Sequence, residues 1–426
     1  MKILFPYLAR WRSANRSRYH QLLTQLGLLG HQVYVLMAPP MALNDISFTD
    51  LETAHSLPKG LTLGELYAPP ALRAFWRWPI PKAKLLKKGL LSLSSVAQIR
   101  RFVSKNQIDV LMAYNLPQVR LLSQVECHKH FDLADDLVAM MEMEGGWAAK
   151  AGGSAAARLA QAKMLAQADS VTVASSVLAE QLDRKVFQLP NGADLNFLDQ
   201  VNGREWRARL SGPCVGFVGA FEYWVNFDLV LDVAERLSQV TFLLVGGGRR
   251  WEQVRQEVER RRLANIHLTG ALPYEQAMNC AAAMDVCLVP FTRSAVSDGS
   301  CPLKLFEYAG LRKPIVSTST REVERIGRGW IAFADQVNEF ADAIEHFLCD
   351  SVAVFEAVET GRALVEQGYN WPTLARRFVE SLSCESATVA TFSEPFPELE
   401  NFLPLDNIIS DKDQLGLAPS RGLASE

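Results

Sequence analysis

Residues 285–317 read DVCLVPFTRSAVSDGSCPLKLFEYAGLRKPIVS. Two short apolar runs, Asp285–Pro290 and Pro314–Ser317, flank a segment with helical spacing, Pro302–Leu311. Runs of this length and composition predict buried strands, and the segment between them predicts a crossover helix. The stretch therefore predicts a strand, helix, strand unit of a parallel sheet.

The same alternation extends towards the N-terminal side of this unit. It predicts strands at Cys214–Gly219, Thr241–Val245 and Asn265–Thr269 and helices at Asn226–Leu237, Arg249–Leu263 and Tyr274–Ala283. Helices that join successive parallel strands cover both faces of the sheet. We therefore expect residues 191–370 to form a Rossmann-like α/β domain.

A less regular form of the pattern runs through the first part of the chain. Apolar runs at 2–9 and 32–37 flank a helical segment at 16–30, and more strand candidates follow at Asp109–Tyr114, His130–Ala134 and Ser170–Ala174. Residues 1–190 are therefore predicted to form a second Rossmann-like domain. We expect the acidic residues 385–426 to form a disordered tail.

Composition limits the function classes. The 426 residues are 49% apolar and carry a net charge of −3, which is too balanced for bulk binding of nucleic acid. The seven cysteines are scattered and never spaced as C-x-x-C, which argues against a disulfide framework and a zinc knuckle. No run approaches the ~20 apolar residues of a membrane span. We expect a soluble, cytoplasmic protein.

The opening of the predicted helix Pro302–Leu311 carries the strongest functional signal. Free amides and the positive end of the helix dipole attract phosphate, and Lys304 adds a full charge there. Glu307, one turn on, shares a face with Lys304 and could accept hydrogen bonds from both hydroxyls of a ribose. Pro302, Leu303, Lys304 and Glu307 thus predict a site for a nucleoside diphosphate, although an exposed Lys–Glu pair without function has the same spacing.

Three strings together resemble a known family. They are P-x-K-x-x-E-Y-x-x-x-x-K-P-x-V-S from residue 302, D-V-C-L-V-P-F at 285–291 and L-P-N-G-A-D at 189–194. They look like glycosyltransferases of the GT-B fold, most of all the teichuronic-acid-type branch and more loosely the glucuronosyltransferase of xanthan assembly. The resemblance covers roughly residues 1–383 and is strongest over 214–318.

This resemblance implies two Rossmann-like domains that face each other across a cleft, and a helix at 371–384 that crosses back to the N-terminal domain. It also implies a nucleotide-sugar donor, a UDP-sugar, held mainly by the C-terminal domain, and an acceptor held by the N-terminal domain. Glu307 would bind the ribose and Lys304 the diphosphate. No cofactor or metal is implied, because basic groups and helix dipoles would neutralise the departing diphosphate.

The chain also departs from the family pattern. Many relatives carry a second acid eight residues before the ribose-binding one, where this chain has Gly299. They also carry an Arg and a Lys after the first strand of the second domain, whereas residues 219–224 contain neither. Arg293 and Arg249 are therefore further candidates for the diphosphate. Arg249 could equally begin a solvated helix.

Glycines follow two of the predicted strands. Gly219 would let donor phosphate approach the backbone, although a tight turn explains it equally well. Gly246–Gly248 lacks the spacing of a dinucleotide-binding loop, so a turn is the preferred interpretation.

The string Asp132–Asp136 ends a short apolar run in the first domain and resembles the D-x-x-D-D of relatives. Asp135 or Asp136 could take the proton from an acceptor hydroxyl, as an inverting transfer requires. The alternatives are a helix cap and a metal-binding acid pair. Asn115 and Arg16, at predicted strand and helix ends of the same edge, are candidates for the acceptor side.

Residues Ala71–Lys105 contain nine bases and no acid, interleaved with leucines and aromatic residues such as Phe75 and Trp76. This pattern is typical of an anionic membrane surface, and a solvated helix face is the alternative. No nucleic-acid motif accompanies it.

The sequence as a whole predicts a metal-independent glycosyltransferase. It would move a sugar from a nucleotide donor to a glycan or lipid-linked acceptor, as a peripheral protein on the cytoplasmic membrane face. Two alternatives remain open: an epimerase or hydrolase of nucleotide sugars with the same fold, and a binding protein that has lost transfer.

Overall fold

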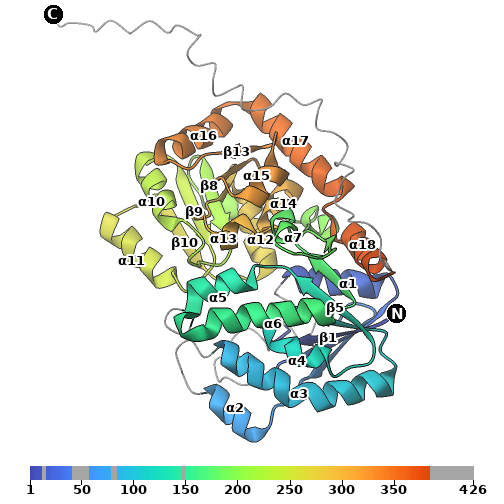
Figure 1. Cartoon of the computed structure of the whole chain (residues 1–426). Helices are drawn as coiled ribbons and strands as arrows, with labels where there is room; N and C mark the ends of the chain where they lie inside the picture. Colours follow the sequence, from blue (N-terminus) through green and yellow to red (C-terminus); the bar gives the residue numbers. More distant parts are fainter. Residues whose placement is uncertain (12–15, 41–56, 78–83, 146–148, 384–426) are drawn as a thin grey trace, which may run out of the picture.

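The computed structural model describes residues 1–11, 16–40, 57–77, 84–145 and 149–383. The predicted acidic tail lies outside the described residues. The described chain forms two parallel sheets, each flanked by helices (Figure 1). The prediction of an α/β protein with two Rossmann-like domains is confirmed.

The N-terminal sheet has, among the described residues, seven strands in the order β3-β2-β1-β4-β5-β6-β7, and all neighbours are parallel. The strands are β1 (Lys2–Tyr7), β2 (Gln32–Met37), β3 (Leu61–Glu65), β4 (Val110–Ala113), β5 (His128–Leu133), β6 (Ser170–Val173) and β7 (Phe187–Gln188). Sequence reasoning missed β3 and β7. The order 3-2-1-4-5 is that of a doubly wound sheet, whose ligands bind at the carboxyl ends of the strands.

Strand alternation divides the apolar residues of this sheet between two cores. Ile3 and Phe5 of β1 belong to one core, whereas Leu4 belongs to the other. In β4, Met112 and Leu111 are divided in the same way. Because successive side chains of a strand point to opposite faces, a run of consecutive apolar residues requires cover on both faces.

The C-terminal sheet has six strands among the described residues, in the order β10-β9-β8-β11-β12-β13, and all neighbours are parallel. They are β8 (Cys214–Val218), β9 (Thr241–Val245), β10 (Ile266–Gly270), β11 (Val286–Val289), β12 (Ile315–Ser317) and β13 (Ile331–Phe333). One large core surrounds this sheet.

Helices connect the strands in both halves. In the first half they are α1 (Arg18–Leu28), α2 (Pro70–Arg77), α3 (Lys84–Asn106), α4 (Val119–Leu122), α5 (Leu137–Gly145), α6 (Ser154–Gln167) and α7 (Ser176–Glu180), with a 3₁₀ turn at Leu116–Gln118 and a π-helical turn at Ala149–Gly153. In the second half they are α8 (Leu195–Leu198), α9 (Arg204–Arg207), α10 (Phe227–Arg236), α11 (Trp251–Arg261), α12 (Tyr274–Ala283), α13 (Ala295–Asp298), α14 (Leu303–Gly310), α15 (Arg321–Gly327), α16 (Val337–Cys349), α17 (Ser351–Gln367) and α18 (Trp371–Ser383).

Two connections between the halves run side by side. The Ala193 amide donates to the Tyr369 carbonyl (2.9 Å), and the Trp371 amide donates to the Ala193 carbonyl (3.2 Å). The second connection leads into α18, whose Trp371, Leu374 and Phe378 join the core beneath α1. Figure 1 shows α18 beside α1, so the last described helix packs on the N-terminal half.

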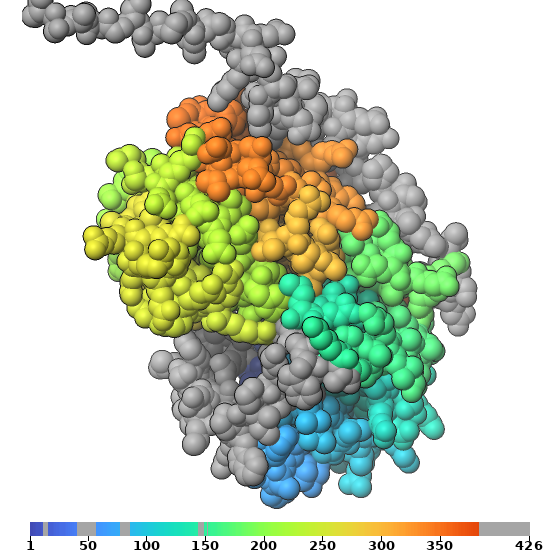
Figure 2. Space-filling view, turned by 60° about the vertical axis from the view of Figure 1, so that its left-hand side comes forward, coloured from blue at the N-terminus to red at the C-terminus, as the bar shows by residue number. Residues whose placement is uncertain are grey.

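The two halves meet through residues that follow the carboxyl ends of their strands. The Ser175 hydroxyl, after β6, donates to the Gly299 carbonyl (2.7 Å), and the Ser176 amide donates to Glu322 (3.0 Å). In Figure 2 the orange residues of the C-terminal half lie directly against the teal and green residues of the N-terminal half.

Candidate functional site

Helix α14 begins after β11 has carried the chain to the carboxyl edge of the C-terminal sheet. The buried Pro302 is the N-cap, with an extended backbone (φ −73°, ψ 130°). Amides in the first turn of a helix have no acceptor within the helix, so those of Leu303 and Lys304 point out of its end. Leu303 packs against the core of the N-terminal half. The helix opening therefore faces the other domain.

Lys304 lies between two aromatic rings at this opening. Its ammonium Nζ is 4.7 Å from the centre of the Phe217 ring and 5.0 Å from that of Phe291. Burial lowers the pKa of Lys304 to about 8, and the nearby Glu307 opposes this shift. The amine is therefore mostly charged at neutral pH, and since Lys304 is only partly exposed, it could form a strong charge-assisted hydrogen bond to a phosphate.

Gly219 brings the turn after β8 against this ammonium. A Cβ atom at Gly219 would lie 3.0 Å from Lys304 Nζ, and the backbone has φ +155°. At Gly246 a Cβ would lie only 1.8 Å from the Gly219 carbonyl oxygen. The two glycines thus allow the loops after β8 and β9 to pack together, which supports the interpretation of Gly246–Gly248 as a turn.

Glu307 lies one turn into α14 and is 7% exposed. Its Oε1 accepts a hydrogen bond from the Tyr274 hydroxyl at 2.9 Å. Burial raises the pKa of Glu307 to about 7, while Tyr274 and Lys304 pull it down. The carboxylate keeps one oxygen that the Tyr274 hydroxyl does not contact, and a ribose hydroxyl could donate to it.

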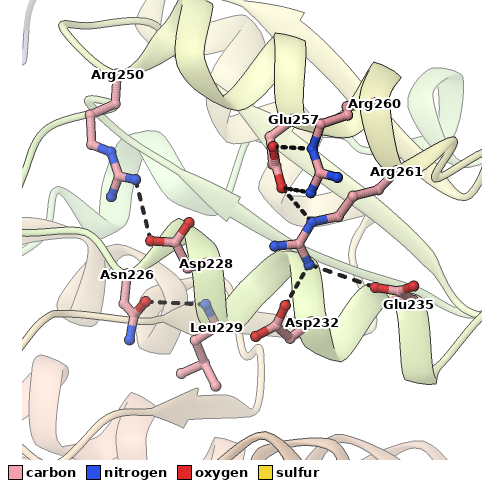
Figure 3. A network of polar contacts seen from close by, with 9 residues as sticks. All are labelled: Asn226, Asp228, Leu229, Asp232, Glu235, Arg250, Glu257, Arg260 and Arg261. Atoms are coloured by element: carbon pink, nitrogen blue, oxygen red, sulfur yellow. Dashed lines mark hydrogen bonds and ion pairs between the residues drawn. The ribbon is translucent and has the colours of Figure 1, made fainter.

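The arginine candidates lie in different settings. Arg293 is exposed on the loop after β11. Arg249 forms an ion pair with Glu222 (3.2 Å) and lies over the Tyr223 ring, so part of its charge is already matched. Figure 3 shows the next residue, Arg250, turned towards Asp228 of α10. Lys304 and Arg293 therefore remain the better candidates for a diphosphate.

The two acids after β5 differ in their surroundings. Asp136 Oδ1 accepts from the Ala139 amide (2.8 Å) and so caps α5, as one of the alternatives predicted. Asp135 is exposed, but neighbouring protein groups partly desolvate its carboxylate, which raises its pKa. Arg18 opposes this shift, and the charges of Asp132 and Asp136 add to it. Of the two candidates for a general base, Asp135 has the more suitable environment.

Asp132 of the same string is a structural residue. It is fully buried, and the Arg18 guanidinium donates to both of its oxygens at 2.9 Å. Although burial opposes ionisation, Arg18 and Thr172 outweigh it, so the pKa of Asp132 is lowered. Arg18 also donates to the Pro190 carbonyl (3.1 Å) and the Asn191 side chain (3.0 Å), which fixes the connection between the domains.

The two residues predicted to bind the acceptor, Asn115 and Arg16, lie in different surroundings. Asn115 follows β4 and is partly exposed at the carboxyl edge of the N-terminal sheet. Arg16, the other candidate for the acceptor side, reaches the C-terminal half: it pairs with Asp194 (3.0 Å) and lies over the Phe197 ring. It therefore lies beside the residues proposed for the donor.

Sequence reasoning missed the polar partners that lie far apart in the chain. Tyr274 is 33 residues from Glu307, and Arg18 is 114 residues from Asp132. Glu322, fully buried, accepts from the amide and hydroxyl of Ser176 across the domain boundary. The one local signal was the position of Tyr274, which follows the end of β10 at the ligand-binding edge.

Comparisons with known proteins agree with this architecture. Residues 212–350 match the family described as glycosyl transferases group 1. A protein named as the teichuronic acid biosynthesis glycosyltransferase TuaH of Bacillus subtilis (strain 168) is 25% identical over 182 residues, which is 40% of this chain and 46% of TuaH. The chain spans less than half the length of the curated relatives it matches.

Solved structures extend the likeness to most of the chain. Sucrose-phosphate synthase from Thermosynechococcus elongatus superimposes with a TM-score of 0.71 at 18% identity, over 89% of this chain and 97% of the synthase. The chain has the GT-B fold of glycosyltransferases. Another GT-B structure, Anabaena Alr3699/HepE in complex with UDP-glucose, gives a TM-score of 0.67 at 17% identity, over 90% of this chain and 99% of HepE.

The expected resemblance to GT-B glycosyltransferases is thus confirmed. The family match covers β8 to α16, the part of the GT-B fold that holds Lys304 and Glu307. The roles of individual residues stay predictions.

Proposed function

We propose that the protein is a glycosyltransferase that moves a sugar from a nucleoside-diphosphate donor to a glycan or lipid-linked acceptor. The observation that carries this proposal is the opening of α14, where Lys304 lies against the Gly219 turn and Glu307 follows on the same helix. One cation and free amides suit a diphosphate, and a carboxylate one turn on suits a ribose.

The donor proposed is a UDP-sugar, which HepE holds in its solved complex. Asp135 would accept the proton of the acceptor hydroxyl, and Asn115 would contact the acceptor. The positive charge of Lys304 and the helix dipole would stabilise the departing diphosphate, so transfer would need no metal.

A panel of nucleotide sugars tests this proposal. A ligand that binds the folded protein alone raises its apparent stability, so UDP-sugars should raise Tm more than free sugars do. The UDP-sugar with the largest shift is then supplied with lipid-linked glycan acceptors, and elongated product is measured. Release of UDP with free sugar alone would favour a hydrolase instead, and binding without turnover would favour a non-catalytic protein.

We also propose that the protein works on the cytoplasmic face of an anionic membrane. Leu86, Leu90 and Leu93 on α3 are 58%, 37% and 45% exposed, and their spacing places them on one face of the helix. Phe75 and Trp76, expected at the lipid interface, instead pack against the core. The leucines, with the bases around them, would contact lipid. Within the described residues no helix is both long and apolar enough to cross a membrane.

Charge reversal on α3 should weaken this membrane contact. Arg100 and Arg101 are exposed beyond the leucines, and each base near an anionic surface contributes about 1 kcal/mol. We expect Arg100→Glu with Arg101→Glu to reduce co-sedimentation with phosphatidylglycerol vesicles by at least about tenfold. The same reversal at Arg204 and Arg209 of the C-terminal half is the control. Equal sedimentation of the two variants would contradict the proposal.

A further inference from the structure

We infer that Tyr274 is a positioning residue for Glu307, and that Arg16 from the opposite domain holds Tyr274 in place. The inference rests on the proposed function, since it assigns Glu307 to the ribose of the donor. It adds a contribution of the N-terminal domain to the donor site.

The contact between Tyr274 and Glu307 fixes the carboxylate. The Tyr274 hydroxyl donates to Glu307 Oε1 at 2.9 Å. Tyr274 is the first residue of α12, and Glu307 lies within α14. Glu307 is 7% exposed, so a rotated side chain would lose this hydrogen bond without gaining water. With Oε1 engaged by Tyr274, the other oxygen is held in one orientation.

Arg16 lies near the Tyr274 ring and closer to the neighbouring Phe197 ring. Its guanidinium carbon is 4.5 Å from the centre of the Phe197 ring and 5.7 Å from that of Tyr274, and the two rings are 5.2 Å apart. Asp194 fixes the guanidinium at 3.0 Å and also caps the helix that carries Phe197. A planar guanidinium stacks on aromatic faces more readily than an ammonium does.

This arrangement joins the two domains at the donor site. Arg16 precedes α1 of the N-terminal half, whereas Tyr274, Phe197 and Asp194 belong to the C-terminal half. A relative movement of the halves would separate Arg16 from the two rings. The position of Glu307 would then depend on whether the domains are close together.

The charges around Glu307 determine how this can be measured. Lys304 on α14 and the Tyr274 hydroxyl on α12 both favour the ionised carboxylate, while burial disfavours it. The positive charge of Arg16 lowers the pKa of Tyr274, whereas the negative charge of Asp194 raises it. Because the Tyr274 hydrogen bond lowers the pKa of Glu307, its removal should raise that pKa above about 7.

The first test needs no nucleotide. A carboxyl whose pKa is raised on folding stabilises the protein below its unfolded pKa, and this contribution is lost as the pH rises through the folded value. In Tyr274→Phe the pKa of Glu307 is expected to be higher, so this loss of stability should continue to higher pH than in the wild type. The deficit in Tm relative to wild type should therefore grow from pH 6 to pH 9. A deficit that is the same at every pH would overturn the inference.

The second test uses UDP as the probe. Ribose hydroxyls bind the ionised carboxylate, so Tyr274→Phe should lower UDP affinity about three- to tenfold at pH 6.5, an effect that shrinks towards pH 9. Arg16→Ala should also weaken UDP binding more at pH 6.5 than at pH 9, but by a smaller factor. A loss of affinity independent of pH would overturn the inference.

Matched controls separate a local effect from general damage. Tyr34→Phe removes a hydroxyl that contacts Gln32 in the N-terminal half, and Arg10→Ala removes an ion pair with Glu65. Neither should change the pH dependence of Tm or of UDP affinity. If wild type binds no UDP, the proposed function fails, whereas the nucleotide-free test still decides the role of Tyr274.

Discussion

Replacing Arg18 with methionine should lower the free energy of unfolding by about 3–5 kcal/mol. Asp132, fully buried, would lose both of its hydrogen bonds from the guanidinium and would remain as an unpaired charge. The connection at Pro190 and Asn191 would lose its anchor as well. Urea unfolding followed by circular dichroism measures the change.

The pH dependence of this loss gives a second check. In the wild type, Arg18 keeps the pKa of Asp132 low, so the pair stabilises the fold above the unfolded pKa of the acid and less as the pH falls through the folded value. In Arg18→Met the unpaired Asp132 would be protonated at a higher pH. The difference in free energy of unfolding between wild type and Arg18→Met should therefore become smaller as the pH falls from 7 to 5.

Two further variants control this experiment. Arg100→Met removes an exposed arginine of α3 and should change stability by less than about 0.5 kcal/mol. The double variant Arg18→Met with Asp132→Leu removes both charges and should recover part of the loss. If Arg18→Met were as stable as Arg100→Met, the ion pair of Arg18 and Asp132 would not hold the domain connection.

Replacing Asp135 with asparagine should lower kcat by about 10²–10⁴-fold, the usual contribution of a general base. The carboxylate lies at the carboxyl edge of the N-terminal sheet, where partial desolvation and the neighbouring Asp132 and Asp136 raise its pKa. UDP affinity should not change, because the donor residues lie on the other sheet. Steady-state transfer and UDP titration together measure both quantities.

Asp136→Asn is the matched control for this prediction. Asparagine caps a helix as well as aspartate does, so α5 should keep its first turn while the neighbouring carboxylate disappears. We expect near wild-type kcat. If Asp136→Asn loses activity and Asp135→Asn does not, the assignment of the base is wrong.

Local patterns predicted the longer elements of this fold well. Apolar runs such as Val286–Val289 are buried on both faces in the structure, as their composition indicates. The strands that were missed are short or mixed in polarity: Leu61–Glu65 contains Thr62, Gly64 and Glu65, Phe187–Gln188 has two residues, and Ile331–Phe333 has three. Their pairing depends on neighbouring strands rather than on their own sequence.

In the candidate site, too, local sequence signals predicted some residues and missed others. The opening of α14 follows from local signals, since Pro302 begins the helix and Lys304 and Glu307 share a face. The partners of these residues come from distant segments, so no spacing in the sequence marks them. Arg16 illustrates the limit, because only the packed domains place it beside Tyr274.

Calorimetric titration of UDP into wild type and Lys304→Ala tests the central claim most directly. A charge-assisted hydrogen bond to phosphate contributes about 1.5–3 kcal/mol, so the variant should bind UDP roughly 10- to 100-fold more weakly at pH 7. Lys313→Ala, on the opposite edge of the same sheet, should bind like wild type. Equal affinity of Lys304→Ala and wild type would contradict a diphosphate site at the start of α14.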